Sequence, residues 1–148
     1  MDESLLQQLV WVLLALGAVA VGVLGHWPRL RGRYHDGDHV VTLEHRGPVL
    51  WGEAQVRGGK ETYLGVVVAG RIRLRRYDWG QNHLGDLGFG ADTAATMDGA
   101  CTGTFVLERG PAGALTGHFV GRRLRIEQGR LKTSERLAPI PRTWQRAP

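Results

Sequence analysis

The sequence predicts a mainly β protein, with one N-terminal transmembrane helix followed by a small antiparallel β-barrel of about eight strands. Three observations predict it: an uncharged apolar run at the N-terminus, short strand-like segments separated by Gly-rich turns, and no 3.6-residue apolar stripe after residue 26. With 148 residues, the chain has room for one compact domain and one accessory segment. We therefore expect an anchor at 1–28, a barrel at 29–137 and a Pro-rich tail at 138–148.

The N-terminal run extends from Leu5 to Gly25 without a charged residue. At 1.5 Å per residue these residues form roughly 31 Å of helix, about the thickness of the hydrocarbon layer. A cleaved signal peptide is the alternative, but the leading residues are Asp2 and Glu3, and no Lys or Arg precedes the run. The pattern favours an uncleaved anchor.

Charge predicts the orientation of this anchor. All 19 Lys and Arg residues follow the run, and Arg29, Arg31 and Arg33 lie directly after it. The positive-inside rule then places the N-terminus outside and the C-terminal domain in the cytoplasm. The single cysteine, Cys101, excludes a disulfide within the chain.

Six residues, four of them small, recur along the run with spacings of three and four. This spacing places them on one helix face, where small side chains let helices pack closely. The alternative is chance, since Ala and Gly are common in membrane helices. The predicted packing residues, for a partner that is either a second copy or another protein, are Gln8, Trp11, Ala15, Ala18, Gly22 and Gly25.

The expected strands follow in chain order, each bounded by Gly- or Pro-containing turns. They are Val40–Arg46, Val49–Arg57, Glu61–Val68, Arg71–Trp79, Cys101–Arg109, Ala114–Gly121, Leu124–Gln128 and Arg130–Ser134. Alternation along them predicts a core of Leu50, Leu64, Val66, Val68, Ile72, Leu74, Phe105, Leu107, Leu115, Phe119, Leu124 and Ile126.

The same alternation places arginines together on the opposite face, at 71, 73 and 75 in one strand and at 123 and 125 in another. A solvated outer face is one interpretation, and a surface for phosphate or anionic lipid is the other. The basic charge is spread over this face and one rim, so it favours a small anion or an anionic surface over duplex nucleic acid.

Signatures of catalysis are nearly absent. The two serines, Ser4 and Ser134, lie outside any nucleophile motif, and no zinc-protease, phosphate-loop or dinucleotide fingerprint occurs. The segment from His35 to His39 holds four potential metal ligands, but its Asp-Gly pair is typical of an exposed turn. We expect neither an enzyme, nor a cofactor, nor a metal.

One cluster does suggest binding: the segment from Arg76 to His83, at the end of a strand. Aromatic rings stack on nucleobases, Arg pairs with phosphate and Asn contacts base edges. The alternative is a polar loop with one packed Trp. The candidate ligand-binding residues are Tyr63, Tyr77 and Trp79 for stacking, Arg76 for phosphate and Asn82 for a base edge.

The segments Gly103-Thr-Phe-Val-Leu107 and Leu115-Thr-Gly-His-Phe-Val-Gly121 look like paired strands of small calycin-type barrels, and Gly32-Arg-Tyr34 is similar to their opening. With the anchor, the chain resembles the membrane-anchored β-barrel effectors of bacterial cyclic-oligonucleotide anti-phage signalling. That resemblance implies nucleotide binding, antiviral defence, a location in the bacterial inner membrane, and homo-oligomers that form through the membrane helix.

The functional expectation is thus a single-pass sensor or effector whose barrel binds a small anionic ligand, with a cyclic oligonucleotide as the candidate. Its expected partners are the lipid bilayer, this ligand and further copies of the chain. The alternative is a non-catalytic structural or assembly subunit of an inner-membrane protein complex. The basic outer face and the small-residue helix face fit both readings.

Overall fold

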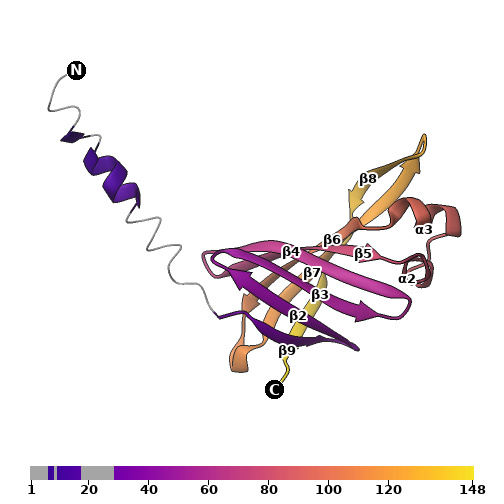
Figure 1. Ribbon diagram of the computed structural model, residues 1–148, viewed down its shortest axis with the longest axis horizontal. Helices are drawn as coiled ribbons and strands as arrows, with labels where there is room; N and C mark the ends of the chain where they lie inside the picture. Colours follow the sequence, from indigo (N-terminus) through magenta and orange to yellow (C-terminus); the bar gives the residue numbers. More distant parts are fainter. Residues whose placement is uncertain (1–6, 9, 18–28) are drawn as a thin grey trace.

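A computed structural model describes residues 7–8, 10–17 and 29–148, and its main feature is a closed antiparallel barrel of eight strands (Figure 1). Each strand pairs with its neighbours in antiparallel register. The ring runs β1-β2-β3-β4-β5-β6-β7-β9 and closes between β9 and β1. The prediction of a mainly β chain with an antiparallel barrel is therefore confirmed.

The wall strands pair in chain order up to β7. They are β1 (Gly32–Asp36), β2 (His39–Arg46), β3 (Val49–Val56), β4 (Gly59–Val68), β5 (Arg71–Trp79), β6 (Ala100–Arg109), β7 (Leu115–Glu127) and β9 (Ile140–Arg146). A short 3₁₀ turn, η1 (Pro111–Gly113), joins β6 to β7. Antiparallel closure leaves no free edge within the ring, and this is the usual way for a small all-β domain to protect its edges.

Two tight turns show why neighbouring strands pair. Ala69 and Gly70 have φ of 49° and 76°, and Gln128 and Gly129 have φ of 53° and 72°. Positive φ at both central residues matches the twist of a two-residue hairpin. These turns fix the registers of β4 with β5 and of β7 with β8 (Arg130–Arg136).

Aromatic side chains fill the barrel interior. The Trp144 ring lies 4.9 Å from Phe105, 5.6 Å from Tyr63 and 6.4 Å from Tyr34, measured between centroids. Trp144 comes from β9, so the Pro-rich segment at 138–148 supplies a wall strand and the largest buried side chain.

One part of the predicted core is wrong. Leu64, Val66 and Val68 point out of the barrel and are exposed, whereas Tyr63 and Val67 of the same strand are buried. A run of three valines fits either face, so the apolar pattern alone does not fix the register. In the observed orientation of β4, Glu61 faces the interior with Tyr63 and Val67, and there it forms an ion pair with Arg76 that is described below.

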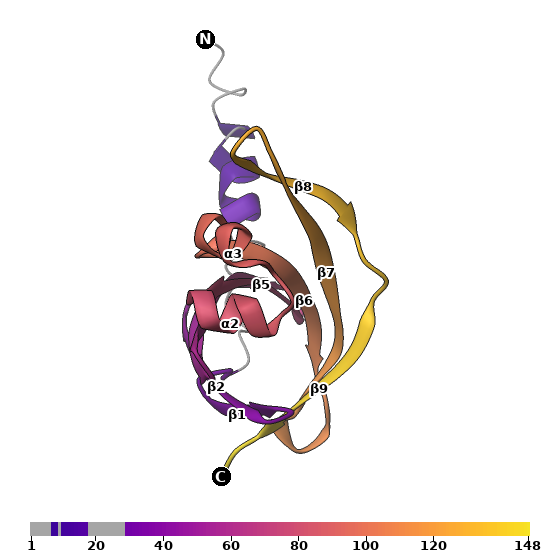
Figure 2. The ribbon, with the colours of Figure 1, turned by 90° about the vertical axis from the view of Figure 1, so that its right-hand side faces the viewer.

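The barrel has one covered end. Two short helices, α2 (Gln81–Asp86) and α3 (Ala91–Met97), connect β5 to β6 and lie at this end, which faces the viewer in Figure 2. The C-terminal half of β7 continues past the ring and pairs with β8, so the β7–β8 hairpin projects beyond the barrel. Leu124 and Leu131 of the hairpin pack against Leu84, Ala94 and Met97 of the helices.

The structure corrects two predictions for the N-terminus: the transmembrane helix, and with it the single-pass inner-membrane location. Residues 7–8 and 10–17 are helical, but within the described residues no helix has the length and apolarity needed to cross a bilayer. Of the predicted packing residues, Gln8, Trp11 and Ala15 are exposed on this helix. The other three, Ala18, Gly22 and Gly25, lie outside the described residues.

Candidate functional site

Beneath the covered end, polar side chains of three wall strands and α2 meet in a buried network. Glu61 comes from β4, Arg76 and Asp78 from β5, His83 from α2 and Thr102 from β6. The register of β5 with β6 shifts after Arg76, so that Tyr77 pairs with Cys101 and Thr102 is the extra residue. Such a bulge re-aims a side chain, and here the Thr102 hydroxyl donates to the Asp78 carboxylate.

Arg76 is the centre of this network. Its Nη2 lies 2.7 Å from Asp78 Oδ1 and 3.0 Å from Glu61 Oε1, and its Nε donates to Asp78 at 3.1 Å. His83 Nε2 lies 2.7 Å from the same Asp78 oxygen, and the Tyr63 hydroxyl donates to Glu61. The network ties α2 to the barrel wall through His83.

The pKa directions follow from this pairing. Burial alone would raise the pKa of Asp78, but the hydrogen bond and charge of Arg76, with the Thr102 and His83 hydrogen bonds, hold it below its usual range. Burial alone would lower the pKa of Arg76, but Asp78 and then Glu61 hold it above its ordinary value. Burial first, and then the charge and hydrogen bond of Glu61, raise the pKa of Tyr63 far above its ordinary value.

Glu61, Asp78 and His83 also form a donor set of the kind that binds divalent cations, with ligand atoms within 4.8 Å of one another. The arrangement does not fit a metal, because the guanidinium of Arg76 is already ion-paired with both carboxylates, its Nη2 lying within 3.0 Å of an oxygen of each. A second cation beside it would be repelled. The cluster is an ion-pair network that fixes the end of the barrel.

The five predicted ligand-binding residues are distributed over different surfaces. Tyr63 and Arg76 lie inside the buried network. Trp79 lies on the outer wall, where its Nε1 donates to Thr62 Oγ1 at 2.8 Å, and Asn82 is exposed on α2. Tyr77 points outward and lines a groove on the outer wall. The structure therefore does not bring these residues together in one site.

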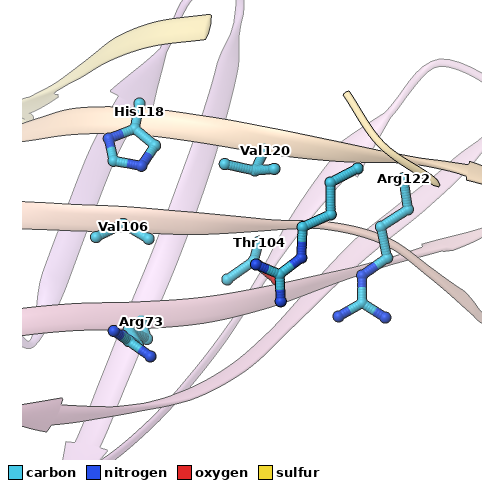
Figure 3. Close-up of a pocket in the computed structure, with 7 residues that line it drawn as sticks. Arg73, Thr104, Val106, His118, Val120 and Arg122 are labelled. Atoms are coloured by element: carbon cyan, nitrogen blue, oxygen red, sulfur yellow. The ribbon is translucent and has the colours of Figure 1, made fainter. Parts of the chain in front are cut away.

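That groove lies across the outer faces of β3 to β8. It consists of two overlapping hollows of about 530 and 220 Å³, which share Arg73, Thr104, Arg122 and Arg136. Figure 3 shows the smaller hollow, with His118, Val120 and Arg122 on β7, Thr104 and Val106 on β6, and Arg73 on β5. We call this surface the arginine groove.

Cross-strand register builds the groove as two rows of outward side chains. One row runs Val66–Arg73–Val106–His118, and the next runs Leu64–Arg75–Thr104–Val120. Neighbouring strands are about 4.8 Å apart, so Arg73 and Arg75 on β5 lie roughly 10 Å from the backbone of β7. Arg122 of β7 pairs directly with Arg136 of β8 at the mouth of the projecting hairpin.

The charge of the groove is uncompensated. No acidic residue is among those lining either hollow, and across the described part of the chain Arg73, Arg75, Arg122 and Arg136 have no ion-pair partner. By contrast, Arg71 pairs with Glu108 at 3.1 Å. Like charges directly opposite each other destabilise a strand pair, so the pairing of Arg122 with Arg136 has an electrostatic cost that an anion would remove.

Sequence reasoning found part of this groove and missed the rest. It placed Arg73 and Arg75 together on the outer face, and the structure confirms that face. It missed Arg122 and Arg136, because two separate strands were expected where β7 is continuous from Leu115 to Glu127. The signal was present in the alternation of His118, Val120 and Arg122.

Comparisons with known proteins do not identify the site, so its function is inferred from its geometry. No protein-family model matches the chain, and neither a curated protein nor a solved structure matches it. The resemblance to membrane-anchored effectors stays a prediction.

Proposed function

We propose that this protein is a binding protein for a small polyanionic ligand, which it holds in the arginine groove, with cyclic oligonucleotides as the first ligand class to test. The observation that carries the proposal is the set of four guanidinium groups, Arg73, Arg75, Arg122 and Arg136, around one hollow without an acidic partner among the described residues. Guanidinium groups recognise phosphate oxygens through paired, charge-assisted hydrogen bonds.

The dimensions support a ligand with more than one phosphate. A hollow of about 530 Å³ is within the range of small-molecule sites. The cations form two groups, Arg73 and Arg75 on one wall and Arg122 and Arg136 on the other, so two anionic groups are accommodated about two strand spacings apart. Tyr77 lines the same hollow, where its ring is available to stack on a base.

Calorimetric titration of the full chain with a panel of cyclic di- and trinucleotides tests this proposal. We expect at least one member to bind, with an affinity that falls as salt is raised because exposed charges are screened. In the double variant Arg122→Gln/Arg136→Gln, we expect the affinity to fall by at least ten-fold for each guanidinium group removed, since each one donates charge-assisted hydrogen bonds to the anion.

Arg130→Gln is the matched control, since Arg130 is exposed on the same hairpin but does not line the groove. Its affinity should equal that of the wild type. Absence of binding to every cyclic nucleotide and to pyrophosphate would contradict the proposal, as would equal losses in Arg130→Gln and the double variant.

A further inference from the structure

Beside the arginine groove, the outer face of β3 and β4 carries a continuous apolar strip. Its five side chains are between 41 and 57% exposed, and we call it the apolar strip: Val49, Trp51, Leu64, Val66 and Val68. Register places Val49 directly opposite Val66, and Trp51 directly opposite Leu64. Contiguous exposed apolar surface of this kind usually marks a binding surface.

The strip and the groove are parts of one trough. Val49, Leu64 and Val66 line the 530 Å³ hollow together with the four arginines. Val66 and Arg73 also line an adjoining hollow of about 390 Å³, which extends the trough to Val68 at the end of β4. A ligand seated on the arginines therefore has apolar wall running directly away from its anionic group.

Charge complementarity distinguishes between two possible binding partners of this surface, a second copy of the chain and an anionic ligand. A second copy of the chain would bring its own unpaired arginines to the contact, which is unfavourable. An anionic ligand supplies the missing opposite charge, and an apolar extension of that ligand would cover the strip. One molecule with an anionic head and an aliphatic chain would both neutralise the arginines and cover the apolar strip.

The geometry points to an amphiphilic phosphate as the ligand class: a single aliphatic chain that lies along the apolar strip and ends in a phosphate held by Arg73 and Arg75, the arginines directly opposite Val66 and Leu64. This inference rests on the proposed anion-binding function. It goes further, because it assigns the chain-binding surface to residues of β3 and β4 that the anion itself does not require.

The test is a titration of the full chain with free, monomeric butyl, octyl and dodecyl phosphate below their micellar concentrations. Because the strip covers one side of the chain, we expect the affinity to rise by about two-fold for each added methylene. In the variant Trp51→Gln/Val68→Thr, which alters the strip outside the 530 Å³ hollow, the gain in affinity from octyl to dodecyl phosphate should disappear while the affinity for pyrophosphate stays unchanged.

Leu87→Asn is the matched control, since Leu87 is 45% exposed at the end of α2 and lies outside the trough, against 43% for Trp51. Its chain-length dependence should equal that of the wild type. If butyl phosphate binds and longer chains bind no better, the chain-binding inference is overturned while anion binding stands. It is equally overturned if the dependence of affinity on chain length survives in the strip variant. A parallel titration with anionic phospholipid vesicles would also overturn it if the vesicles bind and none of the monomeric alkyl phosphates does. Failure of every phosphate, pyrophosphate included, would instead overturn the proposed function.

Discussion

Replacing Asp78 with Asn will lower the free energy of unfolding at neutral pH by about 3–5 kcal/mol, the usual cost of removing one partner of a buried ion pair. Asp78 is fully buried and accepts hydrogen bonds from Arg76 and Thr102, with His83 Nε2 also 2.7 Å away. The substitution keeps the shape but leaves the buried Arg76 with Glu61 alone. Urea denaturation monitored by Trp fluorescence measures the difference.

The effect should depend on pH in a defined direction. The folded-state pKa of Asp78 lies below the ordinary carboxyl value of 3.8, so its stabilisation is complete above that value and is lost as the pH falls through the folded pKa. The difference in free energy of unfolding between the wild type and Asp78→Asn should therefore become smaller in acid. A gap that widens in acid would contradict the assigned ion pair.

Glu108→Gln serves as the control for this variant, because it breaks an ion pair with Arg71 in which both side chains are more than half exposed. Exposed pairs contribute about 0–1 kcal/mol. An equal loss of stability in Asp78→Asn and Glu108→Gln would show that the buried network under α2 does not stabilise the fold.

Replacing Trp144 with Ala should cost about 3–5 kcal/mol of stability, typical of truncating a large buried aromatic residue. Trp144 is fully buried and contacts the rings of Tyr34, Tyr63 and Phe105. Its indole Nε1 has no hydrogen-bond partner among the described residues, so the loss is one of packing. The thermal midpoint and the urea midpoint should fall together.

Trp51→Ala provides the comparison, since the same side chain is 43% exposed on the outer wall. Its loss of stability should be much smaller. If Trp144→Ala were as stable as Trp51→Ala, β9 would not be an integral strand of the barrel, and the closure between β9 and β1 would be in error.

Local sequence predicted the fold where each strand carries its own signal. Alternation and Gly-rich turns are short-range features, and they located most of β2 to β6. Two wall strands were missed. β1 is only five residues long, and β9 contains Pro141, which weakens a strand pattern. Both complete the barrel through pairings that are distant in sequence, which no local pattern reveals.

The candidate site was less accessible to sequence reasoning, for two reasons. Arg76 was expected to meet a phosphate, but the inward carboxylates of Glu61 and Asp78 neutralise it inside the barrel. That pairing depends on the register of β4, which the valine run at 66–68 leaves ambiguous. The arginine groove, in turn, depends on the continuation of β7 beyond the ring and on its pairing with β8.

The central claim is that the arginine groove binds an anion, and NMR of the arginine side-chain Nε–H groups tests it most directly. On addition of pyrophosphate or a bound cyclic nucleotide, the signals of Arg73, Arg75, Arg122 and Arg136 should shift together with one affinity, and that of Arg130 should stay in place. Saturable binding that shifts other arginines while leaving these four unchanged would contradict the claim.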